Sequence, residues 1–198
     1  RIYLDAPLVM SVTAGYGGGT LYKYNWDRVR ECGVENLKLV SDYDPARTTR
    51  VDDSAYDVYH AASGVYITAA EHCWVRNVEF HHFSESAVNM ADGAKNITVQ
   101  DCALYDPVAI ISGGLRYGYH ISHGAQCLVK NCTCDKDRHQ FVTAQKSPGP
   151  NVFTQCTATN AYSTLGPHQR WATGILFDKV STNSRAGVYD AGNGGTGQ

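Results

Sequence analysis

Six short stretches of alternating apolar and polar residues recur along the chain, and each carries a polar residue at its third position. They occupy residues 34–39, 75–80, 99–104, 129–134, 153–158 and 177–182. Alternation over such a length is typical of a β-strand with one buried face. A period that falls mainly in the twenties indicates a solenoid, in which equivalent residues of successive coils stack in columns. The pattern therefore predicts an all-β solenoid whose columns can be read from the sequence.

The third positions form a polar column that consists mostly of amides. Amide side chains favour turns and can hydrogen-bond from one coil to the next. We therefore expect a ladder of hydrogen bonds that lies either at a turn or inside the coil. Its members are Asn36, Asn77, Asp101, Asn131, Gln155 and Lys179.

A second set of strand-like stretches precedes the first, at residues 65–68, 88–91, 119–122, 141–144, 169–172 and 188–191. Alternation assigns one side of each stretch to the core. The expected core residues are Val65, Ile67, Val88, Met90, Tyr119, Ile121, Phe141 and Trp171. The outer side then presents a column of Tyr66, Asn89, His120, Val142, Arg170 and Tyr189.

All seven cysteines fall in three columns whose other members are mainly small apolar residues. This placement predicts thiols that pack as small hydrophobic groups in the core. A disulfide between neighbouring coils is the alternative, because strand spacing lies within the range of a bridge. The odd count leaves at least one thiol free. Zinc is disfavoured, because Cys132 and Cys134 are too close together for the usual ligand spacing.

Composition bounds the function classes. A chain of 198 residues with 43% hydrophobic and 18% charged residues suits one ordered domain spanning 1–198. The net charge of −2 offers no basic field for nucleic acid. No apolar run reaches the length of a membrane-spanning helix. The Gly-rich stretch 192–198 reads as an interrupted turn, so we expect the solenoid to continue beyond both ends.

Residues 41–60 combine Pro, Ser and charged side chains, which predicts a long loop that leaves the stack. Its acidic residues are oxygen donors of the kind that Ca²⁺ prefers. Since they have no defined spacing, a solvated loop is the favoured interpretation, and no other cofactor is indicated. The acids are Asp42, Asp44, Asp52, Asp53 and Asp57.

Arginine, histidine and tyrosine converge on the outer side of about four consecutive coils. Coils stack about 4.8 Å apart, so these side chains are expected to be within contact of one another. A solvated sheet face on which Arg stacks on Tyr is the alternative to a functional site. The set comprises Arg116, Tyr117, His120, Arg138, His139, His168, Arg170, Arg185 and Tyr189.

The stretches Gly33–Leu37, Cys73–Val78, Ile97–Cys102, Arg138–Val142, Gly149–Phe153 and Gly166–Gly174 resemble the right-handed parallel β-helix superfamily, and more narrowly secreted bacterial proteins described as pectate-lyase-like. The resemblance covers roughly residues 30–198. It implies a right-handed parallel β-helix, here a fragment of a longer one, in a secreted or cell-surface protein. The superfamily includes lyases, glycoside hydrolases, epimerases and phage tailspikes. The Ca²⁺-binding acids and catalytic Arg of true pectate lyases have no match here, so the resemblance assigns no catalytic residue.

The leading functional hypothesis is a polysaccharide lyase that cleaves an acidic, uronate-containing polysaccharide by β-elimination. Arg binds carboxylate in a bidentate manner, and His and Tyr can exchange protons near neutral pH. We assign His139 or His120 as the base and Tyr117 as the proton donor, with His168 orienting the substrate. Carboxylate binding is assigned to Arg116, Arg138 and Arg170, and further substrate contacts to Arg185 and Tyr189.

Two alternatives stay open. A glycoside hydrolase needs a pair of carboxyl groups, for which Asp137, Asp190 and Glu85 are candidates without a convincing pairing. The chain can also be a non-catalytic glycan-binding or structural solenoid, because fold does not fix function. No oligomeric state is indicated.

Overall fold

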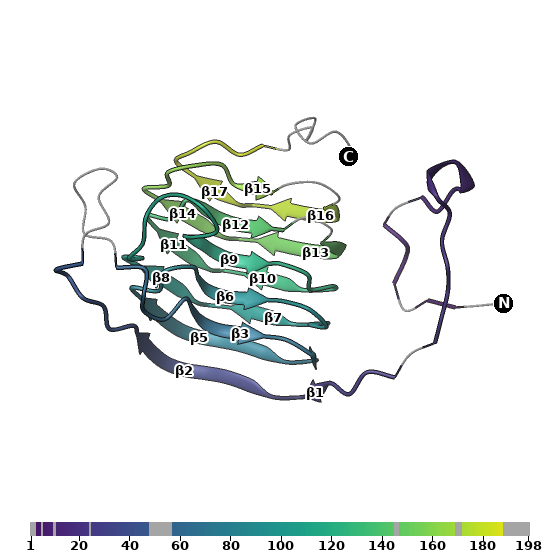
Figure 1. The fold of residues 1–198 in the computed structure, drawn as a ribbon, viewed down its shortest axis with the longest axis horizontal. Helices are drawn as coiled ribbons and strands as arrows, with labels where there is room; N and C mark the ends of the chain where they lie inside the picture. Colours follow the sequence, from purple (N-terminus) through teal and green to yellow (C-terminus); the bar gives the residue numbers. More distant parts are fainter. Residues whose placement is uncertain are drawn as a thin grey trace.

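The structure, a computed structural model, describes residues 3–4, 6–9, 11–23, 25–47, 57–144, 147–168 and 172–187. Strands are the main regular secondary structure of these ranges, and they stack into a coil (Figure 1). A single 3-10 turn, η1 (Ala14–Tyr16), is the helical structure within them. None of this helical structure has the length and apolarity that crossing a bilayer as a helix requires.

The strands, in chain order, are β1 (Val29–Arg30), β2 (Gly33–Val40), β3 (Ser63–Ile67), β4 (Ala70–Glu71), β5 (Trp74–His81), β6 (Ser86–Met90), β7 (Thr98–Gln100), β8 (Ala103–Tyr105), β9 (Tyr117–Ile121), β10 (Leu128–Lys130), β11 (Thr133–Asp135), β12 (His139–Thr143), β13 (Pro148–Thr154), β14 (Thr157–Thr159), β15 (Gly166–Pro167), β16 (Thr173–Asp178) and β17 (Ser181–Thr182). Every pairing between them is parallel.

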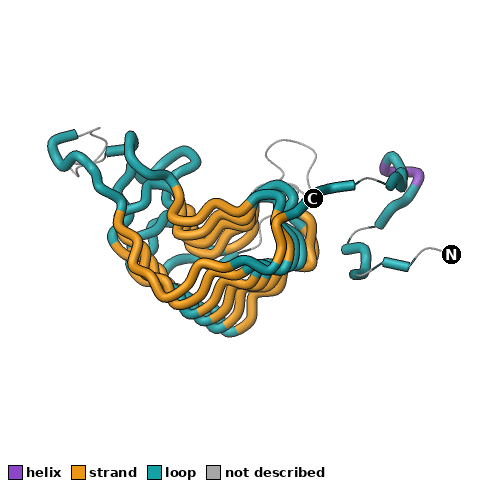
Figure 2. Tube along the Cα trace, turned by 90° about the horizontal axis from the view of Figure 1, so that it is seen from below, coloured by secondary structure: helices purple, strands orange, loops and turns teal. Residues whose placement is uncertain are grey.

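Two larger sheets form the walls of the coil. One has the order β15-β12-β9-β6-β3. The other runs β16-β13-β10-β7-β5-β8-β11-β14-β17, with β2 paired to β5. In this second sheet β2 and β5 run unbroken, while the later coils divide the same path into two strands. Figure 2, which looks along the coil axis, shows the successive coils superimposed around one interior. The predicted all-β parallel solenoid is confirmed.

The interior consists of stacked apolar columns. Val75, Val99, Val129 and Phe153 occupy one column and are at most 1% exposed. The expected core residues on β3, β6, β9 and β12 also pack inward, except that Trp171 lies outside the described residues. Burial of whole columns in each coil is the main stabilising term of this fold.

The polar column lies at an outer corner. All six of its members adopt a left-handed backbone conformation, with φ between 50° and 58°. Asn and Asp tolerate this region better than other non-glycine residues, which explains why the sequence repeats them here. The Asn77 side chain donates to Asn36 Oδ1 at 2.8 Å, and Asn131 donates to Asp101 Oδ1 at 2.6 Å. The ladder is therefore on the turn side, and not inside the coil.

All seven cysteines are free thiols. Six of them are buried, whereas Cys32 is exposed on the first coil. Cys102, Cys132 and Cys156 stack in one column, and each thiol donates to a backbone carbonyl. The prediction of packed core thiols is confirmed for the six, and the structure contains no bridge between coils at these positions.

The last coil differs from the sequence-based register. β15 pairs Gly166 with Val142, so Gly166 takes the position in the column that was expected for Arg170. The expected strand began at Gln169 because the short, glycine- and proline-containing β15 has no apolar alternation to reveal it. Near the N-terminus, residues 3–4 and 20–23 form no strand.

Candidate active site

Four aromatic rings meet where three successive coils stack, and we refer to them as the Tyr117 cluster: Tyr117, His120, His139 and His168. Tyr117 on β9 pairs directly with His139 on β12. The Tyr117 ring centroid lies 5.1 Å from those of His120 and His139, and 5.6 Å from that of His168. The ring centroids of His139 and His168 are 4.6 Å apart. The sequence-predicted donor and its candidate bases are therefore in mutual contact.

His139 is held in one tautomer. Its Nδ1 lies 2.9 Å from the carbonyl oxygen of Thr164, and a carbonyl can only accept, so Nδ1 carries the proton. Nε2 then bears the lone pair, and this atom is buried without a hydrogen-bond partner. Burial lowers the pKa of His139 to about 4, and the positive charge of Arg138 adds to the effect. At neutral pH the ring is thus an uncharged base.

Tyr117 is a neutral phenol at the same pH. Burial raises the pKa of its hydroxyl above the usual value, although Arg138 opposes this change. The hydroxyl donates to the carbonyl of Gly113 over 3.4 Å, which is longer than an ordinary O–H···O bond. A better acceptor can therefore displace this contact at little cost.

Arg138 supplies the positive charge beside the cluster. Its guanidinium donates to the same Gly113 carbonyl as Tyr117 does. Arg138 also lowers the pKa of His168, after the larger effect of burial on that ring. A half-buried guanidinium next to neutral imidazoles and a phenol forms a site suited to an anionic group.

A chain of polar contacts supports His120 from one side. His120 Nδ1 lies 3.7 Å from Glu85 Oε1, which accepts a 3.0 Å hydrogen bond from the side chain of Asn89. Ser122 in turn donates to Asn89 Oδ1 at 2.7 Å. Both ring nitrogens of His120 are buried without a hydrogen-bond partner. Sequence reasoning identified Glu85 and Asn89 by column, but it missed Ser122.

Arg116 is not placed as the sequence predicted. Its side chain is buried, donating from Nε to Ala109 O at 2.8 Å and from Nη1 to Lys136 O at 3.1 Å. The left-handed backbone at Arg116, with φ of 57°, turns the residue away from the outer column. Its guanidinium braces the segment that joins β8 to β9, so the assignment of Arg116 as a carboxylate ligand is wrong.

The remaining predicted contacts fall outside this cluster. Ala186 pairs with Leu165, which places Arg185 in the column of Gln140 and not in that of Arg138. Arg185 is exposed there. Arg170 and Tyr189 lie outside the described residues, and the structure says nothing of their positions.

The carboxyl pair of a glycoside hydrolase is not assembled by the described residues. Asp137 is fully enclosed in the coil beside Gly118, and burial raises its pKa well above the usual value. Glu85 is partly exposed and contacts His120 and Asn89. Asp190, the third candidate, lies outside the described ranges. Asp137 lies inside the coil beside the core thiol of Cys134, so it is excluded as a hydrolytic residue.

The weak expectation of Ca²⁺ in the 41–60 loop receives no support. Within the described residues, no three His, Cys, Asp or Glu side chains are arranged to hold a metal ion. The Asp57 carboxylate accepts the backbone N–H groups of Asp44 and Tyr59 at 2.9 and 2.8 Å. Asp52 and Asp53 are not among the described residues.

Comparison with known proteins identifies the family to which the sequence is similar. The sequence profile of the right-handed beta helix region matches residues 50–195, which is most of the chain and includes every residue of the Tyr117 cluster. Searches of curated proteins and of solved structures each gave no significant match.

Proposed function

The chain belongs to the right-handed β-helix family, and on that basis we propose that it is a polysaccharide lyase acting on an acidic, uronate-containing polysaccharide. Its location is proposed to be the cell surface or the surrounding medium, where such polymers occur. The observation that carries the proposal is the contact between the Tyr117 phenol and the His139 ring, whose Nε2 lone pair is buried and without a partner.

β-Elimination of a uronate requires three groups. A base removes the C5 proton, a cation stabilises the charge that develops on the carboxylate, and an acid protonates the leaving O4. His139 Nε2 is the base, because its tautomer is set by Thr164 and its ring is neutral at pH 7. Arg138 binds the carboxylate, and to do so it gives up its hydrogen bond to the Gly113 carbonyl.

Tyr117 completes the reaction. As the C5–H electron pair forms the C4=C5 double bond, the C4–O4 bond breaks and O4 takes the phenolic proton. The products are an unsaturated uronate and a new hydroxyl end. The proton on His139 then returns to the Tyr117 phenolate, which restores the site. His120 and His168 flank the phenol and bind sugar hydroxyl groups.

The arrangement also favours one stereochemistry. Tyr117 and His139 come from paired positions on adjacent strands and lie side by side, so base and acid approach the sugar from the same side. Syn elimination follows, which requires the C5 proton and O4 to be on one face of the ring. Glucuronate and mannuronate meet this requirement, whereas galacturonate, guluronate and iduronate do not.

The test is incubation of the protein with a panel of these uronate polymers, followed by ultraviolet absorbance of the unsaturated product. We expect absorbance to rise with polymers of the first group only. New reducing ends without a double bond would mean a hydrolase, and retention without cleavage would mean a binding protein. Either result would overturn the lyase proposal.

A further inference from the structure

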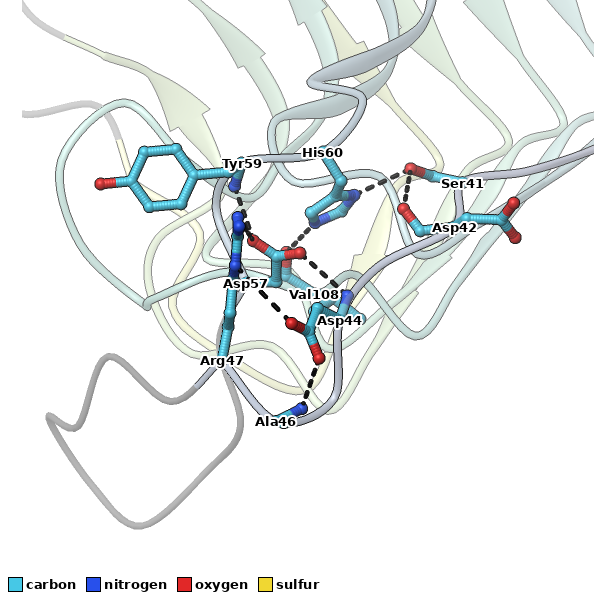
Figure 3. A network of polar contacts seen from close by, with 9 residues as sticks. All are labelled: Ser41, Asp42, Asp44, Ala46, Arg47, Asp57, Tyr59, His60 and Val108. Atoms are coloured by element: carbon cyan, nitrogen blue, oxygen red, sulfur yellow. Dashed lines mark hydrogen bonds and ion pairs between the residues drawn. The ribbon is translucent and has the colours of Figure 1, made fainter.

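A second polar site lies apart from the Tyr117 cluster, where the chain leaves β2 and returns toward β3. Residues 40–44, Arg47, Asp57 and 59–61 line a shallow, open hollow of about 550 Å³ there. Figure 3 shows the hydrogen bonds and ion pairs that connect its walls. None of these side chains has a part in the proposed lyase reaction.

Ser41 and His60 form a hydrogen-bonded pair in this hollow (Figure 3). Ser41 Oγ lies 2.8 Å from His60 Nδ1. His60 Nε2 lies 2.8 Å from the carbonyl oxygen of Val108, on the segment between β8 and β9. Because that carbonyl can only accept, Nε2 carries the proton and Nδ1 accepts from the serine hydroxyl. A hydroxyl hydrogen-bonded to a base that is itself oriented by a third group is the arrangement of an activated nucleophile.

The surrounding contacts hold this pair in place. The backbone N–H of Ser41 donates to His81 O at 3.0 Å, which fixes the serine to the end of β5. Asp57 is only 4% exposed and accepts from the backbone of Asp44 and Tyr59, so it ties the two sides of the hollow together. Arg47 lies 3.8 Å from Asp57 and stacks over Tyr59 with 5.4 Å to its ring centroid.

We infer that Ser41 and His60 form a second catalytic site, one that hydrolyses a carboxylic ester of a short acyl group. Ser41 Oγ attacks the ester carbonyl and its proton passes to His60 Nδ1. The alcohol leaves with that proton, which gives an acyl-serine. Water then attacks the acyl-serine, His60 again accepts and returns a proton, and a carboxylic acid and free Ser41 result. No metal or cofactor enters these steps.

The charge of the hollow selects among esters. The described residues of its lining include three carboxylates, those of Asp42, Asp44 and Asp57, and one guanidinium, that of Arg47. An anionic substrate is therefore disfavoured, and an uncharged ester such as an acetylated sugar hydroxyl fits best. This preference is opposite to that of the Tyr117 cluster, where Arg138 attracts an anion.

The experiment uses diisopropyl fluorophosphate, which phosphorylates activated serines, with intact-mass and peptide analysis of the whole chain. We expect one phosphoryl adduct on Ser41 in the wild-type protein. Ser41→Ala should take up none, and His60→Gln should react on the order of 10²-fold more slowly, which is the lower range for loss of a general base. Ser112→Ala, at an exposed serine, is the matched control and should react like wild type.

Two further outcomes decide the inference. Folded wild-type protein that gains no adduct, or that gains it on another serine, overturns the proposal whether or not the variants fold. Hydrolysis of p-nitrophenyl acetate should follow the same order among the variants and should be unchanged in the control Ser112→Ala. A wild-type protein that forms the adduct on Ser41 but cleaves no uronate polymer would overturn the lyase proposal and leave the Ser41 site supported.

Discussion

Replacing His139 with Gln is the sharpest test of the proposed lyase site. Gln can still donate to the Thr164 carbonyl, so the contact that orients the side chain is retained. It cannot accept the C5 proton. With a pKa of about 4 for His139, roughly one ring in a thousand is protonated at pH 7, so nearly all of the wild-type protein holds the proposed base in its uncharged form. We therefore expect kcat to fall by the whole contribution of a general base, about 10²- to 10⁴-fold, with KM little changed.

The assay is the initial rate of ultraviolet absorbance from a glucuronate or mannuronate polymer, at several pH values. Because the base acts in its unprotonated form, the wild-type rate should be constant down to about pH 5 and should fall tenfold per pH unit below the pKa of about 4. His72→Gln, at an exposed histidine of a corner, is the matched control and should behave as wild type. A His139→Gln protein that retains a tenth or more of the wild-type kcat would refute the assignment.

Three further predictions concern the proposed acid, the pH dependence of stability, and the packing of the coil. Tyr117→Phe should lower kcat by about 10²-fold or more on polymers but should spare a uronate with a 4-O-nitrophenyl group, because that leaving group needs no proton; equal losses on both substrates would contradict the role of the phenol. Folded His139 has a pKa below that of the unfolded chain, so stability should fall as the pH decreases from about 6.5 to about 4, and thermal melts of His139→Gln should show a smaller fall. Phe153→Ala, at a fully buried position, should lower the free energy of unfolding by about 3–5 kcal/mol in urea titrations. Asn131→Ala, in the exposed ladder, should lower it by about 1–2 kcal/mol. Asn131→Gly should lower it less, because glycine accepts the left-handed φ.

The repeat made the fold predictable, since stacking forces each column to keep one environment. Asn77, Asp101 and Asn131 share a polar corner because each must adopt a left-handed backbone, and a residue type suited to that corner recurs. The core columns followed from the same periodicity. The sequence repeat therefore predicted which residues of different coils stack on one another. Such long-range contacts are rarely predictable in a β-fold, but they are in a solenoid.

The site was predictable only where the repeat was regular. Tyr117 and His139 were assigned correctly to adjacent coils, because β9 and β12 both show clear alternation. The predicted register of the last coil, which put Arg170 where Gly166 lies, was wrong because β15 is a strand of two residues with no apolar pattern. The prediction for Arg116 was wrong for another reason: its left-handed backbone, at the end of an insertion, changes the direction of its side chain.

Several contacts that define the site involve backbone atoms, which carry no residue-type signal. The carbonyl of Thr164 sets the tautomer of His139, and that of Gly113 receives both Tyr117 and Arg138. Any residue type supplies such a carbonyl. Only the three-dimensional path of the chain shows which one is nearby.

The proposed base His139 and the proposed acid Tyr117 lie on neighbouring coils, and His168 comes from a third. No single coil contains all three side chains, so a transplanted coil would carry the scaffold without the proposed site. The proposed site therefore depends on the register between neighbouring coils, because a slip of one residue would separate Tyr117 from His139 and would also turn core side chains outward.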